Sequence, residues 1–311
     1  MKRITVSGGS GFVGRALVAK LLERGDEVTV LGRDAARARH ALDPEGRQSR
    51  LTVQSWRAGE ADCAPLEAIE GRDAVVQLAG ETLVGKRLTE HLRQEARRSR
   101  VDSTRALVAA FSRVENQPAL FVSGSAVGYY GSLPAEQVVD EGSPPGDDYF
   151  ARLCREWEAA ALAAPAEMRV VIARLGIVFG RDGGALEALV RPFRLFAGGP
   201  IGSGRQIVSW IHLEDTARAL LHCIDSHDAR GPYNVCAPEP ASNREIATVL
   251  GRVLRRPALL PAPAFALRAL FGKDGAAPIL EGQRVAPRRL SESGFSFRYP
   301  TVSAAIDELL G

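Results

Sequence analysis

Three glycines near the N-terminus have the spacing of a turn that binds phosphate groups. Gly8, Gly11 and Gly14 lie in the segment ITVSGGSGFVG, directly after a run of β-branched residues. In such a turn the first glycine permits a tight bend, the second lets the backbone approach a pyrophosphate, and the third lets the following helix pack against the strand. The helix N-terminus then directs its free amide groups at the phosphates. The spacing therefore predicts a dinucleotide site.

The residues predicted to bind the cofactor also include the end of a later strand. Small residues end the hydrophobic segment AVVQLAG (74–80), which suits the close approach of a ribose or an adenine, although the segment could equally be an ordinary buried strand. The predicted cofactor-binding residues are Gly8, Ser10, Gly11, Phe12, Val13, Gly14, Arg33, Leu78, Ala79, Gly80 and Leu175.

The residues at the end of the second predicted strand, VTVLGR (28–33), determine whether NAD or NADP is preferred. An acidic side chain there would accept hydrogen bonds from the ribose 2′-hydroxyl of NAD, whereas an arginine accommodates the 2′-phosphate of NADP. Arg33 occupies this place, with Arg37 and Arg39 close behind. Asp34 could be a ribose ligand displaced by one residue, but its position fits the N-cap of the next helix better. We therefore predict NADP(H) as the cofactor.

The elements that must position these residues alternate between strands and helices. The predicted strands include residues 4–6, 28–33, 74–80, 119–125 and 169–180, and the predicted helices include residues 89–114 and 150–163. This alternation is typical of βαβ units, in which ligands bind beyond the carboxyl ends of parallel strands. The predicted fold class is α/β, a Rossmann doubly wound parallel sheet.

The composition is that of an ordinary soluble globular protein. The chain has 311 residues, of which 45% are hydrophobic and 25% charged, and a formal net charge of +3. This near balance argues against a dedicated binder of nucleic acid or of anionic membranes. The four cysteines are widely spaced, which favours a reduced, cytoplasmic compartment, and no histidine has the spacing of a metal ligand, so no metal is predicted.

Longer motifs carry a resemblance to a known family. They are GGSGFVG, SRVDSTRALV, SGSAVGYYG, GRQIVSWIHLEDTARAL, GPYNVCAPEPASNREIA and LEGQRVAPRRLSESGFSFRYP. Over nearly its whole length the chain resembles the extended short-chain dehydrogenase/reductases, in particular their atypical epimerase-family subgroup with a DUF1731-like C-terminal segment. The resemblance implies an NADP-binding Rossmann domain of residues 1–176 and 206–236, and a smaller, discontinuous C-terminal substrate lobe of residues 177–205 and 237–311.

The same resemblance places a catalytic helix at GDDYFARLCREWEAAAL (146–162), where the usual residues are absent. In active relatives a serine orients the carbonyl, a tyrosine transfers the proton, and a lysine holds the ribose and lowers the tyrosine pKa. Aligned on Glu158, Phe150 takes the tyrosine position and Cys154 the lysine position. The atypical subgroup lacks the usual triad, so this departure fits the placement but weakens the mechanism. The helix face is equally explained as a stripe that faces the core.

Other side chains are candidates for catalysis. Ser125 or Ser123 matches the catalytic serine of the family, although either hydroxyl could simply cap the strand end. Tyr149 lies beside the usual tyrosine position, and Tyr129 and Tyr130 follow the serine strand. An unassisted tyrosine has a pKa near 10, so it is almost fully protonated at pH 7. A protonated phenol favours carbonyl reduction, which needs an acid, over alcohol oxidation, which needs a base.

Further polar residues have both a structural and a functional interpretation. One predicted helix face, either a solvated surface or an anion site, carries Arg93, Arg97 and Arg100. The resemblance also puts Arg100 where extended relatives have an asparagine of the proton relay, so that relay is predicted to be absent. His212 is expected to be a hydrogen-bonded structural residue or a ligand contact. Arg205 and Gln206 are expected in a polar turn or against an anionic substrate group.

The prediction for function is an NADP(H)-dependent oxidoreductase, of reductase or epimerase type, acting on an unidentified carbonyl or nucleotide-sugar-like substrate. The alternative is a catalytically impaired NADP(H)-binding sensor or regulatory protein. A scaffold without cofactor would leave the coincidence of the glycine turn with Arg33 unexplained. The predicted partner is a small-molecule substrate, with no nucleic acid and no membrane, and the chain is expected to be a monomer or a homodimer.

Overall fold

A parallel sheet forms the centre of the molecule in the computed structural model, which describes residues 1–57, 63–83 and 85–311. The strand order is β12-β7-β5-β4-β1-β2-β3, and each neighbouring pair is parallel. The strands are β1 (Arg3–Ser7), β2 (Glu27–Gly32), β3 (Leu51–Ser55), β4 (Ala74–Gln77), β5 (Leu120–Ala126), β7 (Arg169–Leu175) and β12 (Gly231–Val235). The direction of winding reverses between β1 and β4, and a ligand is expected beyond the carboxyl ends at that switch point.

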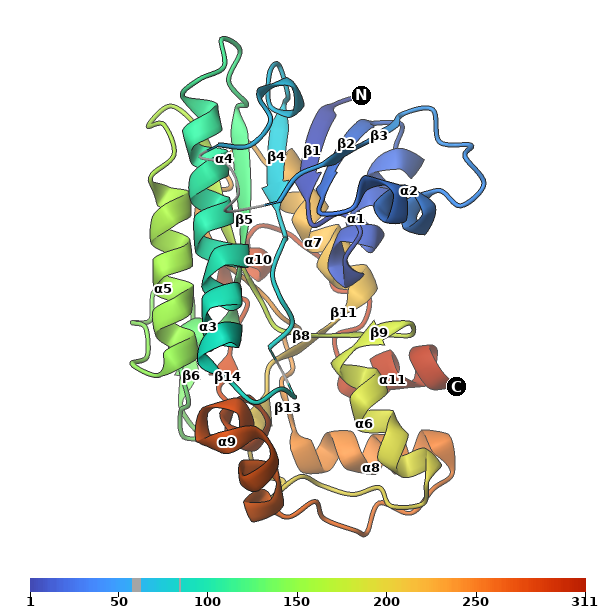
Figure 1. The fold of residues 1–311 in the computed structure, drawn as a ribbon. Coiled ribbons are helices and arrows are strands. Elements are labelled where there is room, and N and C mark those ends of the chain that lie inside the picture. The colour runs from blue at the N-terminus through green and yellow to red at the C-terminus, as the bar shows by residue number, and fades with distance from the viewer. Residues whose placement is uncertain (58–62, 84) are drawn as a thin grey trace.

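Helices cover both faces of this sheet (Figure 1). One face is covered by α1 (Phe12–Glu23), α2 (Ala35–Leu42), α7 (Leu213–Asp225) and α10 (Arg288–Glu292), and the other by α3 (Glu90–Arg97), α4 (Ser103–Phe111) and α5 (Tyr149–Leu162). Leu17 and Leu220 are buried in the core of the first face, and Leu107 and Phe121 in that of the second. The predicted doubly wound α/β fold is confirmed.

A smaller group of elements lies beyond the carboxyl ends of the strands (Figure 1). It contains a sheet of β8 (Ile177–Gly180), β9 (Gly183–Gly184) and β11 (Trp210–His212), a pair of β10 (Ile207–Val208) and β13 (Ala241–Ser242), and the helices α6 (Ala185–Arg194), α8 (Asn243–Leu254), α9 (Ala264–Leu280) and α11 (Val302–Leu310). Phe193, Trp210, Leu250 and Ile306 share a separate core there. A parallel pair of β6 (Val138–Val139) and β14 (Arg284–Val285) joins this region to the segment after β5.

The C-terminal segment is fixed to the large sheet before it enters the smaller region. Leu290 on α10 is buried in the same core as β7 and β12. Asp215, which is buried on α7, accepts hydrogen bonds from the backbone amides of Arg298 at 2.9 Å and Tyr299 at 2.8 Å. A buried carboxylate with these partners stabilises the segment that leads into α11.

The element predictions need three corrections. The single strand predicted at residues 169–180 was wrong: β7 and β8 belong to different sheets, because the chain turns at Gly176, where a Cβ atom would lie 2.7 Å from the Ser209 carbonyl oxygen. β3 was not predicted, although apolar and polar residues alternate in its sequence LTVQS. The helix predicted at 89–114 is α3 and α4 joined by a π-helical turn at Arg98–Asp102.

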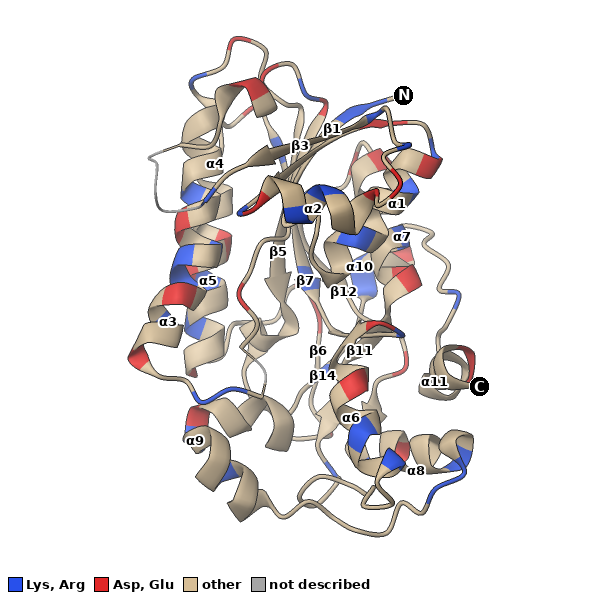
Figure 2. Ribbon diagram, turned by 45° about the vertical axis from the view of Figure 1, so that its right-hand side comes forward, with Lys and Arg blue, Asp and Glu red and all other residues tan. Residues whose placement is uncertain are grey.

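Charged residues of both signs occur along α3 and along α5 (Figure 2). Among the described residues, no helix is both long and apolar enough to cross a membrane. Within the same ranges, no three His, Cys, Asp or Glu side chains gather closely enough to hold a metal ion.

Candidate cofactor and active site

The glycine turn is closed tightly against the end of β4. Gly8 has a φ of +76°, and a Cβ atom there would lie 2.5 Å from the Ala79 nitrogen. A Cβ atom on Gly14 would lie 2.2 Å from the Gly8 carbonyl oxygen, and the Gly11 amide donates to that oxygen at 2.9 Å. Side chains at positions 8 and 14 would therefore displace backbone. The turn thus fits a dinucleotide, whose pyrophosphate needs this close approach of the backbone.

The N-terminus of α1 is open to a ligand. Gly11 is the N-cap residue and has no side chain to cap the first amides, and no acidic residue lies in the first turn. The free amides and the positive end of the helix dipole therefore suit an anion. The side chain of Phe12 packs against Gly180 and Gly184, where added Cβ atoms would each lie 2.6 Å from its ring.

The end of β2 carries the residues predicted to choose the cofactor. The Arg33 side chain is 78% exposed, and its nearest ion partner is Glu81 at 3.9 Å. Asp34 accepts a hydrogen bond from the Arg37 amide at 2.9 Å, so its interpretation as the N-cap of α2 is confirmed. Arg39 forms an ion pair with Asp43 at 3.2 Å. Arg33 therefore extends from the strand end into solvent, where a 2′-phosphate could reach it.

The predicted serines lie on β5, in the interior of the molecule. The Ser125 hydroxyl donates to Oε1 of Glu158 at 2.6 Å, and the Ser123 hydroxyl donates to the Gly124 carbonyl at 3.2 Å. Both side chains are buried. Because the only proton of the Ser125 hydroxyl is directed at Glu158, this serine does not offer it to a substrate carbonyl in this arrangement.

A buried ion pair that the sequence analysis missed accounts for that bond. Arg174 on β7 donates from Nε and Nη2 to the two carboxylate oxygens of Glu158, at 2.9 and 2.8 Å, and the two side chains are 4% and 8% exposed. Burial alone would lower the pKa of Arg174, but the bonds to Glu158 outweigh it and raise the pKa. A lone arginine inside the apolar run VVIARLG was the available signal, since parallel strands seldom bury an unpaired charge.

The network continues to Tyr130 and removes that phenol from the catalytic candidates. Its hydroxyl accepts from Nη1 of Arg174 at 2.9 Å and donates to the side chain of Asn234 at 2.7 Å. Burial raises the pKa of Tyr130 to about 12, against the opposing effect of Arg174. Tyr129 packs its ring beneath the same guanidinium, with 3.5 Å between Cζ and the ring centroid. Both tyrosines therefore belong to the packing of Arg174.

Helix α5 places a buried thiol where the lysine would be. Leu153, Cys154, Trp157 and Ala161 are buried and Phe150 is half-buried, so the predicted stripe that faces the core is confirmed. Burial raises the pKa of Cys154 to about 11, so the thiol is neutral at pH 7. The Trp157 indole donates to the Thr104 hydroxyl at 3.0 Å. This face supplies neither a cation nor a proton donor of ordinary acidity.

Tyr149 has a hydroxyl that is available for chemistry. It begins α5, its ring lies against Phe150, and the Arg93 guanidinium sits 4.3 Å from its ring centroid. Its hydroxyl oxygen is buried and has no hydrogen-bond partner among the described residues. Burial raises the pKa of Tyr149, and the positive charges of Arg93 and Arg100 oppose this only in part. The phenol is therefore protonated at neutral pH.

His212 has a structural role in this arrangement. Its Nδ1 accepts from the Glu214 amide at 3.0 Å and caps α7, which leaves the proton on Nε2 to donate to Glu308 at 3.0 Å. The ring also packs on Tyr299, 4.0 Å between centroids. Burial lowers the pKa of His212. The expected structural role is therefore confirmed, and the ring joins α7 to α11.

The turn at residues 205–206 is also mainly structural. The Gln206 side-chain amide donates to the carbonyls of Ile201 at 3.0 Å and Ile279 at 3.1 Å, which fastens the turn to α9. Arg205 lines an open hollow of about 350 Å³ together with Ser132 and Glu281, whose side chains hydrogen-bond each other at 2.6 Å.

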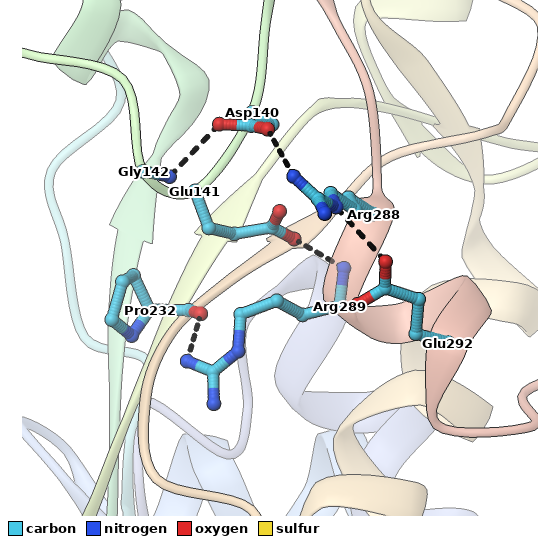
Figure 3. A pocket seen from close by; sticks show the side chains of 7 residues that line it. All are labelled: Asp140, Glu141, Gly142, Pro232, Arg288, Arg289 and Glu292. Carbon is cyan, nitrogen blue, oxygen red and sulfur yellow. Dashed lines mark hydrogen bonds and ion pairs between the residues drawn. The ribbon is translucent and has the colours of Figure 1, made fainter.

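A second hollow, of about 360 Å³, lies between β12 and α10 (Figure 3). Its charged groups are directed at one another: Arg288 reaches Asp140 at 3.3 Å and Glu292 at 2.9 Å, and Arg289 donates to the Pro232 carbonyl at 2.9 Å. The hollow is remote from the glycine turn in sequence and lies against a different strand. Its groups fasten α10 to the sheet.

The comparisons with known proteins agree with this architecture. The model of the NAD dependent epimerase/dehydratase family matches residues 4–236, and a domain of unknown function, DUF1731, matches residues 262–309. The human epimerase family protein SDR39U1 is 38% identical over 99% of this chain and 99% of its own length. A chloroplastic homolog of SDR39U1 from Arabidopsis thaliana is also 38% identical, over 99% of this chain and 86% of the relative.

Solved structures give the same result. A crystal structure of human SDR39U1 with NADPH is 37% identical, covers 99% of both chains and has a TM-score of 0.87. A nucleoside-diphosphate sugar epimerase from Corynebacterium glutamicum is 28% identical with a TM-score of 0.76, over 99% of this chain and 58% of that one. The resemblance drawn from the motifs is confirmed. The chain belongs to the NAD-dependent epimerase/dehydratase family.

Proposed function

We propose that this protein binds NADPH across the switch point between β1 and β4, with the 2′-phosphate against Arg33. The observation that carries the proposal is the glycine turn, whose backbone leaves no space for side chains at Gly8 and Gly14 and ends at an uncapped helix N-terminus. A human relative has been crystallised with NADPH. The residues proposed to hold the dinucleotide are those predicted from the sequence: Gly8, Ser10, Gly11, Phe12, Val13, Gly14, Arg33, Leu78, Ala79, Gly80 and Leu175.

The proposal divides the chain by role. Residues 1–176 and 206–236 are proposed to bind the cofactor, because they contain the large sheet. Residues 177–205 and 237–311 are proposed to bind the substrate, because they contain α6, α8 and α9 beyond the carboxyl ends of the strands. The substrate is proposed to be a carbonyl compound or a nucleotide-sugar-like molecule.

Exchanging Arg33 for glutamine is expected to lower NADPH affinity by about tenfold to a hundredfold, the value of one charge-assisted hydrogen bond. NADH affinity should not change, since NADH has no 2′-phosphate. Titration of intrinsic fluorescence with both nucleotides measures the difference. Arg47→Gln is the control, because Arg47 is an exposed arginine paired with Glu45 at 2.7 Å. Equal weakening of NADH and NADPH by Arg33→Gln would contradict the proposed 2′-phosphate contact.

The chemistry that the site supports best is carbonyl reduction with Tyr149 as the acid. A bound nicotinamide dinucleotide supplies the hydride. The buried hydroxyl of Tyr149 holds its proton at neutral pH, and it has no partner among the described residues that would compete for it. Ser123 and Ser125 remain proposed contacts to substrate. The Ser125 hydroxyl, however, already donates its hydrogen bond to Glu158. A raised tyrosine pKa disfavours the oxidation step that an epimerase must also perform.

The test is transfer of label from NADPH deuterated at the transferable C4 position to metabolites in a small-molecule cell extract, followed by mass spectrometry. Label in a product, with accumulation of NADP⁺, is expected. Tyr149→Phe should slow transfer by about 10² to 10⁴, the usual effect of removing a positioned acid. The rate should show no decline up to about pH 9, because the protonated phenol is the active form and its pKa lies above the ordinary value of 10.0.

Tyr129→Phe is the matched control, because its ring packs beneath Arg174 and is retained in phenylalanine. Equal loss in both variants would contradict the assignment of Tyr149. Label exchanged into a metabolite without net oxidation of NADPH would indicate an epimerase instead.

A cofactor sensor is the second candidate, and one contact favours it. Phe12, which begins α1, packs against Gly180 and Gly184 of the smaller region, so a change at the glycine turn would be transmitted there. Tight NADPH binding with altered protease protection around α6, and no label transfer to any metabolite, would support the sensor over the reductase.

A further inference from the structure

The π-helical turn between α3 and α4 redirects one arginine into the molecule. Arg98–Asp102 form this turn, and such turns are rare and often occur at functional sites. Arg97, directly before it, stays at the surface with 45% of its side chain exposed and pairs with Asp102 and Glu156. Arg100 instead extends toward the carboxyl end of β4, which is where the glycine turn closes on Ala79.

The surroundings of Arg100 leave one of its donors unsatisfied. Its Nη2 donates to the Glu81 carbonyl at 2.9 Å, and its Cζ lies 5.5 Å from the ring centroid of Trp157. A Cβ atom on Gly80 would lie only 3.1 Å from Cζ, so the guanidinium crosses directly over this glycine. Its Nη1 is buried without a hydrogen-bond partner in the described part of the chain. A buried N–H without an acceptor is unfavourable, so the unpaired Nη1 of Arg100 points to an acceptor that a bound ligand would supply.

The Tyr149 hydroxyl is a second buried group without a partner, and it belongs to the same neighbourhood. Burial raises the pKa of Tyr149 and the charge of Arg100 opposes the rise. Burial likewise raises the pKa of Cys154, again opposed by Arg100. The charge of Arg100 therefore acts on Cys154, which holds the usual lysine position, and on Tyr149, which lies beside the usual tyrosine position.

Among the described residues near Tyr149 and Cys154, Arg100 retains a buried donor without a hydrogen-bond partner. Arg93 also approaches Tyr149, but its Nη2 pairs with Asp274 at 2.6 Å. Cys154 is a neutral thiol and supplies no charge. Unlike a lysine, an arginine keeps its proton under all physiological conditions, so it can hold an oxygen atom but does not exchange protons with Tyr149.

We propose that Arg100 binds the nicotinamide half of the dinucleotide, donating from Nη1 to a ribose hydroxyl oxygen in place of the lysine that Cys154 replaces. This inference rests on the proposed binding of NADPH. It is consistent with a glycine at position 80, since a Cβ atom there would lie 3.1 Å from Cζ and press on the guanidinium. It also explains how a site without lysine keeps a positive charge beside the proposed acid.

The test compares NADPH with adenosine 2′,5′-diphosphate, which has the adenine half and the 2′-phosphate but no nicotinamide ribose. Arg100→Gln should weaken NADPH by about tenfold to a hundredfold, the value of one hydrogen bond to a charged group, and leave the fragment unchanged. Arg97→Gln, an exposed arginine of the same helix, should change neither affinity. Arg100→Lys should recover part of the NADPH affinity that Arg100→Gln loses, because lysine restores the positive charge but not the position of the Nη1 donor.

The outcomes separate this inference from the proposed function. If the unaltered protein binds neither ligand, NADPH binding itself is wrong and the inference falls with it. If NADPH binds equally to the unaltered protein and Arg100→Gln, only the role of Arg100 is overturned. Equal weakening of NADPH and the fragment would show that Arg100 acts through the fold and would also overturn it.

Arg100→Met provides a second variant if Arg100→Gln does not fold. Methionine keeps an apolar stem against Trp157 and buries no unpaired N–H, so the ligand-free melting temperature should be unchanged or higher. The rise in melting temperature on adding NADPH should be smaller than in the unaltered protein. A lower ligand-free melting temperature with a full NADPH-induced rise would mark Arg100 as structural.

Discussion

Gly11→Ala is expected to weaken NADPH binding at least about a hundredfold while the protein stays folded. Gly11 has φ −74° and ψ 175°, a backbone conformation that alanine adopts without strain. Its Cβ atom would lie 3.2 Å from the Gly8 carbonyl oxygen, so the turn needs to give by only a few tenths of an ångström. The methyl group would instead occupy the space through which the backbone approaches the pyrophosphate. Calorimetric titration measures the affinity, and circular dichroism checks the fold.

Two other glycines make the experiment specific. Gly142→Ala should change neither affinity nor stability, because its Cβ atom would meet only Oδ1 of Asp140, at an ordinary 3.4 Å. Gly14→Ala should destabilise the protein as well as prevent binding, because its Cβ atom would lie 2.2 Å from a backbone oxygen. A folded Gly11→Ala protein with unaltered NADPH affinity would show that the dinucleotide does not lie on this turn.

The parts of the site that could be predicted from sequence depend on local backbone geometry. The glycine turn needs only a strand, three spaced glycines and a helix, all within residues 3–23. The N-cap at Asp34 is equally local, because its partner is the amide three residues later. Short-range rules of this kind hold whatever the rest of the chain does.

Arg100 illustrates why a regular pattern misleads. A helix of uniform pitch puts Arg93, Arg97 and Arg100 on one face, which suggests a solvated surface. The π-helical turn changes the direction in which successive side chains leave the helix. Arg97 therefore stays exposed, while Arg100 lies over Gly80. No residue type in the segment marks such a turn, so the sequence pattern did not predict it.

The pairing of Glu158 with Arg174 could not be predicted for a different reason. Glu158 served in the sequence analysis only to align the helix with active relatives, and nothing in the helix pattern revealed its partner, which lies on β7, the strand that follows α5. In the structure the Glu158 carboxylate neutralises the buried Arg174 guanidinium and accepts a hydrogen bond from the Ser125 hydroxyl.

Glu158→Ala is therefore expected to destabilise the protein by about 3–5 kcal/mol, because it leaves the Arg174 guanidinium buried without its counter-ion. Urea unfolding followed by circular dichroism measures the free energy of unfolding. Glu156→Ala, two residues away, removes an exposed carboxylate whose pair with Arg97 is 3.2 Å long, and it should cost less than about 1 kcal/mol. Both variants replace a glutamate of α5 by alanine, so the difference between their free energies of unfolding measures the effect of burying the charge.

The double variant Glu158→Leu with Arg174→Met separates a structural ion pair from a catalytic one. Removing both charges leaves no unpaired ion, so most of the lost stability should return. If the pair serves only the fold, label transfer from NADPH should return with the stability. Recovery of stability without recovery of transfer would instead place Glu158 in the chemistry, acting through the hydroxyl of Ser125 that it now holds at 2.6 Å.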